Sequence, residues 1–198
     1  MLTAKTVLTA LALAVGAASG ATQVWAGDTI DDGFRLFDEL RLGAYAHNPR
    51  PRVTNLDKEI SGTDLSVEIL TSPLGKGGTG NVFYDFFLSP RAHVGTMIST
   101  NGHNSYVFAG VTWRLKVIGG LYIEPEFGLA ANNGPDHYET NRTWLGSPVT
   151  FREAFGIGYQ LTDHIDITAN IEHISHAQIF NEWNPGQTNW GARLGYKF

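Results

Sequence analysis

The stretch Thr188–Phe198, TNWGARLGYKF, decides how this chain folds. Apolar side chains alternate with polar or small ones up to the last residue, which is the two-residue period of a β-strand. Terminal residues of soluble proteins tend to fray, so a strand that stays apolar to the end of a chain is unusual there. The residues on the apolar face are Trp190, Ala192, Leu194, Tyr196 and Phe198.

Seven earlier segments have the same alternation and are separated by clusters of Gly, Pro, Asn and Asp. They are Asp38–His47, Thr63–Thr71, Tyr84–Ser99, Ser105–Val117, Gly120–Ala130, Val149–Gln160 and His164–His176. Their opposite faces carry the charges Arg41, Glu68, Arg91, Arg114, Lys116, Glu124, Glu126, Arg152, Asp166, Glu172, Arg193 and Lys197. A soluble sandwich would turn these charges toward water, whereas a membrane barrel would pair them in its lumen.

The terminal strand and the connections decide between these two folds. Long connections alternate with tight turns along most of the chain, as in bacterial outer-membrane barrels. The long ones are His47–Gly62, Ala131–Pro148 and Ala177–Gln187, and the tight ones are Ile118-Gly119 and Leu161–Asp163. The sequence therefore predicts an all-β fold, an eight-stranded antiparallel transmembrane β-barrel of the outer membrane.

An eight-stranded barrel is narrow, and side chains fill its interior. This argues against a diffusion pore and places function on the outer wall or at the loops. We expect Glu124 and Glu126, which face the lumen, to pair with Arg114 or Arg152 rather than to bind a cation.

The N-terminus has the features of a cleaved export signal. Lys5 supplies the positive charge, and Val7–Ala18 is an apolar run too short to span a bilayer. Val24-Trp25-Ala26 offers a cleavage site, and Ser19-Gly20-Ala21 is a second candidate. Residues 1–26 are thus the predicted signal peptide and 27–198 the barrel domain. The chain has no cysteine, which excludes disulfides and thiolate metal sites. Its net charge of −5 without a basic cluster gives no indication of nucleic acid binding.

Chemistry is concentrated near the C-terminus, in His173 and Ser175. The two residues are two apart in a predicted strand and share the face of Ile171, which is the lipid-facing side. The strand leaves a tight turn, so both residues lie near its outer end, at the level of the outer-leaflet headgroups. An imidazole beside a serine hydroxyl is the core of an ester-hydrolysis site, and this position implies a lipid ester as substrate.

The motif His173-Ile-Ser175-His-Ala177, followed by Asn184-Pro185-Gly186 and an aromatic terminal strand, resembles the lipid A 3-O-deacylases of the PagL type, acyloxyacyl hydrolase-like outer-membrane barrels. The resemblance implies a serine–histidine hydrolase that removes the ester-linked 3-position acyl chain of lipid A, with no metal or cofactor. In that family an asparagine follows the serine and helps to hold the oxyanion, but His176 stands here. A glutamate follows the family's Asn-x-Gly turn and orients the histidine, but that place falls on Thr188.

A replacement for the missing acid is available on the preceding strand. A turn centred on Thr162 leaves two registers, one of which places the outward-facing Glu153 directly across from His173. A carboxylate there would orient and support the imidazole. Thr188 itself and Glu182, in the last long loop, are the other candidates for this role.

We expect lipopolysaccharide in the outer leaflet as the partner, and the outer-membrane insertion machinery during biogenesis. The sequence does not determine the oligomeric state. Two other functions remain open at this point: a non-enzymatic small barrel that is structural or binds ligands, and a lipid acyltransferase with the same nucleophile.

Overall fold

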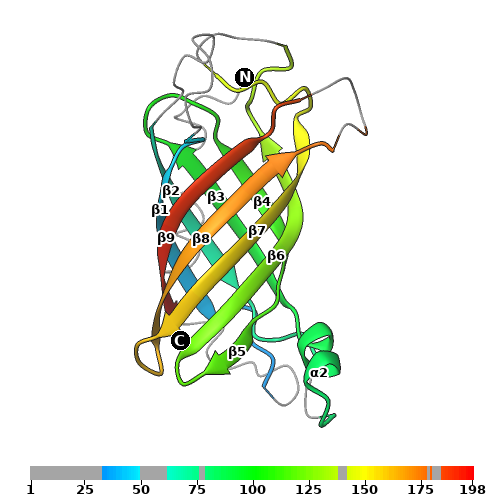
Figure 1. The fold of residues 1–198 in the computed structure, drawn as a ribbon, viewed down its shortest axis with the longest axis vertical. Helices are drawn as coiled ribbons and strands as arrows, with labels where there is room; N and C mark the ends of the chain where they lie inside the picture. Colours follow the sequence, from blue (N-terminus) through cyan, green and yellow to red (C-terminus); the bar gives the residue numbers. More distant parts are fainter. Residues whose placement is uncertain (1–32, 50–61, 76–78, 138–141, 178, 180–183) are drawn as a thin grey trace. The chain divides into compact units, whose positions relative to one another are not determined.

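Nine β-strand segments in the described part of the chain form one antiparallel sheet that closes on itself (Figure 1). The computed structural model describes residues 33–49, 62–75, 79–137, 142–177, 179 and 184–198, and all of these strands belong to the compact unit Leu36–Phe198. The predicted signal peptide at 1–26 and Glu182 lie outside the described residues. The strands are β1 (Glu39–Ala46), β2 (Thr63–Leu70), β3 (Arg91–Ser99), β4 (Tyr106–Thr112), β5 (Leu115–Ile118), β6 (Leu121–Asn132), β7 (Val149–Gln160), β8 (Ile165–Ser175) and β9 (Gln187–Lys197).

The first and last strands, β1 and β9, pair with each other, and the pairing of β4 with β6 closes the sheet. β5 also pairs with β6. Because β4 and β5 are consecutive parts of one interrupted strand, the nine segments make an eight-stranded barrel, and the predicted fold is confirmed.

The predicted strand Tyr84–Ser99 is wrong in its first half. Residues Val82–Leu88 form the helix α2, because the Asn81 side chain caps it by accepting the N–H groups of Phe83 (3.0 Å) and Tyr84 (3.3 Å). Pro90 has no N–H for a ladder bond, so β3 begins only at Arg91. Among the described residues, no helix is long and apolar enough to cross a membrane.

The predicted strand Ser105–Val117 is interrupted at Trp113 and Arg114 without a change of register, and the register shifts only between Lys116 and Ile118. The shift comes after Lys116, which pairs with Tyr122, a buried residue on the lumen side. Lys116 therefore keeps its predicted face, although its side chain is exposed.

The two faces of the barrel wall have opposite character. Toward the lumen lie charged side chains that are almost fully buried, such as Arg41 (1% exposed) and Arg152 (1%). Toward the outside lie aliphatic side chains that are half exposed, such as Leu129 (52%) and Ile157 (52%). This is the arrangement of a transmembrane barrel, which has a lipid-facing apolar wall around a polar interior.

Ion pairs fill the lumen. Glu124 accepts hydrogen bonds from Arg114 (2.7 Å) and Arg193 (2.6 Å), and Glu126 accepts from Arg152 (2.9 Å) and also from Arg193. The expected pairing of the two glutamates is confirmed. Glu124 also binds Arg41, so the two carboxylates share their arginines, and removing one arginine leaves buried negative charge with less compensation.

We predict that Arg193→Leu destabilises the barrel by about 3–5 kcal/mol, because its carboxylate partners stay buried with one cation fewer. Reversible urea unfolding in lipid vesicles, followed by heat-modifiable gel migration, measures this difference in the free energy of unfolding. The control is Lys116→Gln at the exposed position in β5, which should stay within about 0.5 kcal/mol of the native chain. An Arg193→Leu barrel as stable as this control would contradict the prediction.

Candidate active site

His173 and Ser175 project from the outer end of β8 on the same face, and both are half-buried. β8 has 11 residues and begins at Ile165, directly after the turn at the other end. A strand that rises about 3.3 Å per residue and tilts by about 40° places Ser175 about 25 Å above Ile165. This matches the height of the apolar band of such barrels, so the pair lies at its outer edge, as the sequence predicts.

The two strands beside β8 supply the neighbours of His173. Glu153 of β7 is directly opposite on one side, and Thr188 of β9 is directly opposite on the other. The register that places Glu153 across from His173 is therefore the one that the chain adopts. His173 Nδ1 lies 2.8 Å from Thr188 Oγ1, whereas Glu153 is exposed on the outer surface.

The Asn184-Pro185-Gly186 turn supports the imidazole from above β9. Gly186 has φ +63°, and a methyl group there would lie 2.5 Å from His173 Cε1 and 2.7 Å from Nε2. Only a glycine lets the backbone come so close to the ring in this conformation. Asn184 holds the turn, since its Oδ1 accepts the Gly186 N–H (3.0 Å) and its Nδ2 donates to the Leu145 carbonyl (2.8 Å).

These contacts define the chemistry open to the ring. When Nδ1 donates its proton to Thr188 Oγ1, Nε2 carries the lone pair and acts as the base. Ser175 lies two residues farther along the same face, so its hydroxyl shares the lipid-facing surface with this ring.

His176 stands where the resemblance implies an oxyanion-binding asparagine, but its side chain is fully buried. Within the described residues, neither of its ring nitrogens has a hydrogen-bond partner, and Gly146 lies beside Nε2. The ring therefore does not share the exposed surface of Ser175.

Asn48 is a residue that the sequence analysis missed. It follows β1 with φ +39°, and it joins three segments through its backbone N–H to Asn189 Oδ1 (3.1 Å), its Nδ2 to Thr143 Oγ1 (2.9 Å) and its Oδ1 to the Thr188 N–H (3.2 Å). It thus fixes the backbone of the residue that binds His173. No strand period or motif marks it, and only its place between a strand and Pro49 indicates an unusual backbone.

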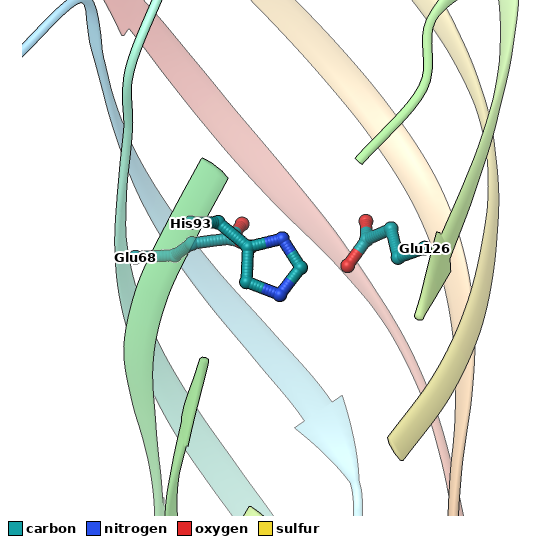
Figure 2. Close-up of side chains that lie close together, drawn as sticks. All are labelled: Glu68, His93 and Glu126. Atoms are coloured by element: carbon teal, nitrogen blue, oxygen red, sulfur yellow. The ribbon is translucent and has the colours of Figure 1, made fainter. Parts of the chain in front are cut away.

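One group of side chains in the lumen has the residue types of a metal site. Ligand atoms of Glu68, His93 and Glu126 lie within 4.8 Å of one another. Figure 2 shows the three side chains close together inside the barrel. Arg152 and Arg193 already bind Glu126. These guanidinium groups would repel a cation, so we interpret the group as part of the lumen ion-pair network.

The sequence of this chain matches the model of one protein family. The sequence model described as Lipid A 3-O-deacylase (PagL) matches residues 88–197, more than half of the chain. No curated protein has a significantly matching sequence.

Solved structures agree in fold. The crystal structure of the outer membrane enzyme PagL is 14% identical to this chain, covers 80% of it and 99% of its own length, and has a TM-score of 0.59. Neisserial surface protein A (NspA) is 13% identical, covers 84% of this chain and 100% of its own length, and has a TM-score of 0.51. At these identities the two structures show a shared barrel fold.

We predict that Asn48→Ala loosens the outer end of β9. Loss of the hydrogen bond to the Thr188 N–H should speed amide exchange there about tenfold, the equivalent of about 1.4 kcal/mol. Hydrogen exchange of the folded barrel in micelles measures this rate. Asn101→Ala is the matched control, because Asn101 binds the Thr63 N–H (2.9 Å) at the same end of the barrel. Unchanged exchange at Thr188 would contradict the role given to Asn48.

Proposed function

This chain belongs to the lipid A 3-O-deacylase (PagL) family, and on that premise we propose that it hydrolyses the ester-linked acyl chain at position 3 of lipid A with Ser175 as nucleophile and His173 as base. The observation that carries the proposal is the position of the pair. Both residues lie on the lipid-facing side of β8 at its outer end, where a lipid ester of the outer leaflet would meet them.

The first half of the reaction forms an acyl-enzyme. Ser175 Oγ attacks the ester carbonyl carbon while its proton passes to His173 Nε2. The tetrahedral intermediate then expels the sugar oxygen, which takes that proton and leaves as the 3-hydroxyl group of lipid A. Because the ring of His176 is buried, backbone N–H groups at the turn beyond Ser175 stabilise the oxyanion in this proposal.

The second half releases the fatty acid. Water attacks the Ser175 ester with His173 as base, and the proton returns to Ser175 as the carboxylic acid departs. Water is the only co-reactant, and the products are the free fatty acid and lipid A with a 3-hydroxyl group. A lipid acyltransferase would differ only here, since another lipid hydroxyl would replace the water.

Support of His173 is divided between two strands. Thr188 accepts the Nδ1 proton and so holds the tautomer with a basic Nε2. Glu153, across the β7–β8 pair, supplies the negative charge that stabilises the imidazolium formed during attack. Together they do the work that the resemblance assigns to one glutamate.

An apolar row lies directly below the His173 row. Ile171 pairs with Phe155 of β7 and with Trp190 of β9, and all three side chains are exposed on the outer wall (41%, 43% and 58%). Acyl chains of a substrate whose ester is at Ser175 would extend down the wall over these residues. Phe151, which pairs with Ser175, completes the apolar surroundings on the β7 side.

Mass spectrometry of lipid A from cells that express the chain tests the proposal. We expect loss of one 3-hydroxyacyl group with the native chain, and a rate reduced by at least about a thousandfold with Ser175→Ala. Ser99→Ala, at the outer end of β3, is the control that should keep full activity.

The released product separates the rival functions. Free fatty acid indicates hydrolysis, whereas the same acyl group on another lipid indicates transfer. Intact lipid A with a folded native barrel would overturn the enzymatic proposal in favour of a non-enzymatic barrel.

We predict opposite effects of two substitutions at Thr188. Thr188→Val removes the acceptor for Nδ1 and should lower deacylation about tenfold, the value of one hydrogen bond. Thr188→Glu restores the acid that the family pattern has at this place and should raise the rate by about the same factor. Initial rates on lipopolysaccharide in mixed micelles measure both. Equal rates for all three chains would exclude Thr188 as the support of His173.

Glu153→Gln tests the charge across β7–β8 separately. The amide keeps the size and removes the charge, so we expect a several-fold loss in the native chain and a smaller loss in the Thr188→Glu background, because the new acid takes over. The same rate assay applies. Full activity of the single variant would rule out Glu153 as the stabilising charge.

A further inference from the structure

The helix α2 lies in the connection between β2 and β3 and exposes large apolar side chains. Phe83 is 77% exposed, Tyr84 64%, Phe87 63% and Leu88 57%. So many aromatic rings on seven residues form a concentrated apolar surface, which is unfavourable in water.

The helix is held in a defined position rather than hanging from a loose connection. Below β2 and β3 the hairpin continues through the Leu74 N–H bond to the Pro90 carbonyl (2.8 Å). Asp85, the charged residue of α2, accepts hydrogen bonds from the Thr79 N–H (2.9 Å) and hydroxyl (2.7 Å). The charge is thus turned back toward the helix start, and the aromatic side chains face outward.

α2 is continuous with the lipid-facing wall. It lies at the end of the barrel that carries the β5–β6 and β7–β8 turns, opposite the end with His173 and Ser175 (Figure 1). Trp113, directly after β4, donates its indole N–H to the Phe87 carbonyl (3.3 Å). Tryptophan side chains are typical of the membrane–water interface, so this contact joins α2 to the wall at interface depth.

We propose that α2 lies in the periplasmic interface of the outer membrane, with Phe83, Tyr84 and Phe87 inserted among phospholipid headgroups and the adjoining acyl chains. Helices that carry aromatic and leucine side chains on an exposed face lie in this region with that face buried at the boundary of headgroups and acyl chains. The occupant of the apolar surface is therefore phospholipid, the same phase that covers the wall above it. Because the barrel between them is rigid, α2 also sets the height of Ser175 relative to the outer leaflet. The proposal depends on the membrane location and not on the deacylase chemistry.

Spin labelling tests the proposal directly, because the chain has no cysteine of its own. A nitroxide is attached to Phe87→Cys in the full barrel, reconstituted in vesicles of phosphatidylethanolamine and phosphatidylglycerol. Collisions with molecular oxygen, which concentrates in lipid, are compared with collisions with a water-soluble nickel chelate. Ile157→Cys on the wall is the lipid control, and Asp163→Cys in the β7–β8 turn is the water control.

We expect the ratio of oxygen to nickel collisions at Phe87 to be close to that at Ile157 and several-fold above that at Asp163. A ratio equal to that at Asp163 would place α2 in water and overturn the proposal. Dipolar broadening between labels on different molecules would show that a second copy covers the helix, which also overturns it. If Phe87→Cys fails to fold, the same measurement is made with Tyr84→Cys, another exposed position of α2. Neither measurement depends on lipid A deacylation.

Discussion

Charge compensation inside a narrow lumen is the constraint on which the structure depends. Arg193 lies among Glu68, Glu124 and Glu126, and no bulk water is available to solvate any of them. A charge in such surroundings is tolerated only when partners of opposite sign are held in place. The charged inward side chains are therefore occupied by this pairing, and the candidate catalytic side chains lie on the outer surface.

The strand period then decides which outward positions meet across the wall. An apolar row at Ile171 and a polar row at His173 cross β7, β8 and β9, and above them Ser175 pairs with Phe151 of β7. Polar side chains on a lipid-facing wall are unfavourable at mid-depth and tolerated near the interface. The polar row and Ser175 occur only where β8 reaches the outer edge of the apolar band. The same geometry that makes His173 and Ser175 tolerable also brings them to the ester region of the outer leaflet.

Much of this could be predicted from the sequence, because alternation and a tight turn are local signals. The bounds of β7 were predicted as observed, and the turn after it restricted the β7–β8 register to two choices. Tyr84–Leu88 was misread because alternating aromatic residues suit a strand as well as a short helix, and only the Asn81 cap and Pro90 separate the two. The role of Asn48 could not be predicted from the sequence, because its partners Thr143 and Thr188 lie next to it only when the barrel closes.

Thr188 in the place of an acid changes what must happen around His173. In our proposal a hydroxyl fixes the tautomer, but it does not offset the positive charge that the ring gains during attack. The nearest carboxylate across the strands, Glu153, is exposed at the membrane interface, where the effective dielectric is lower than in bulk water. Its attraction for the imidazolium is accordingly stronger there than at a soluble protein surface. In our proposal the depth of the barrel thus contributes to catalysis, and α2, which we place in the opposite interface, helps to maintain it.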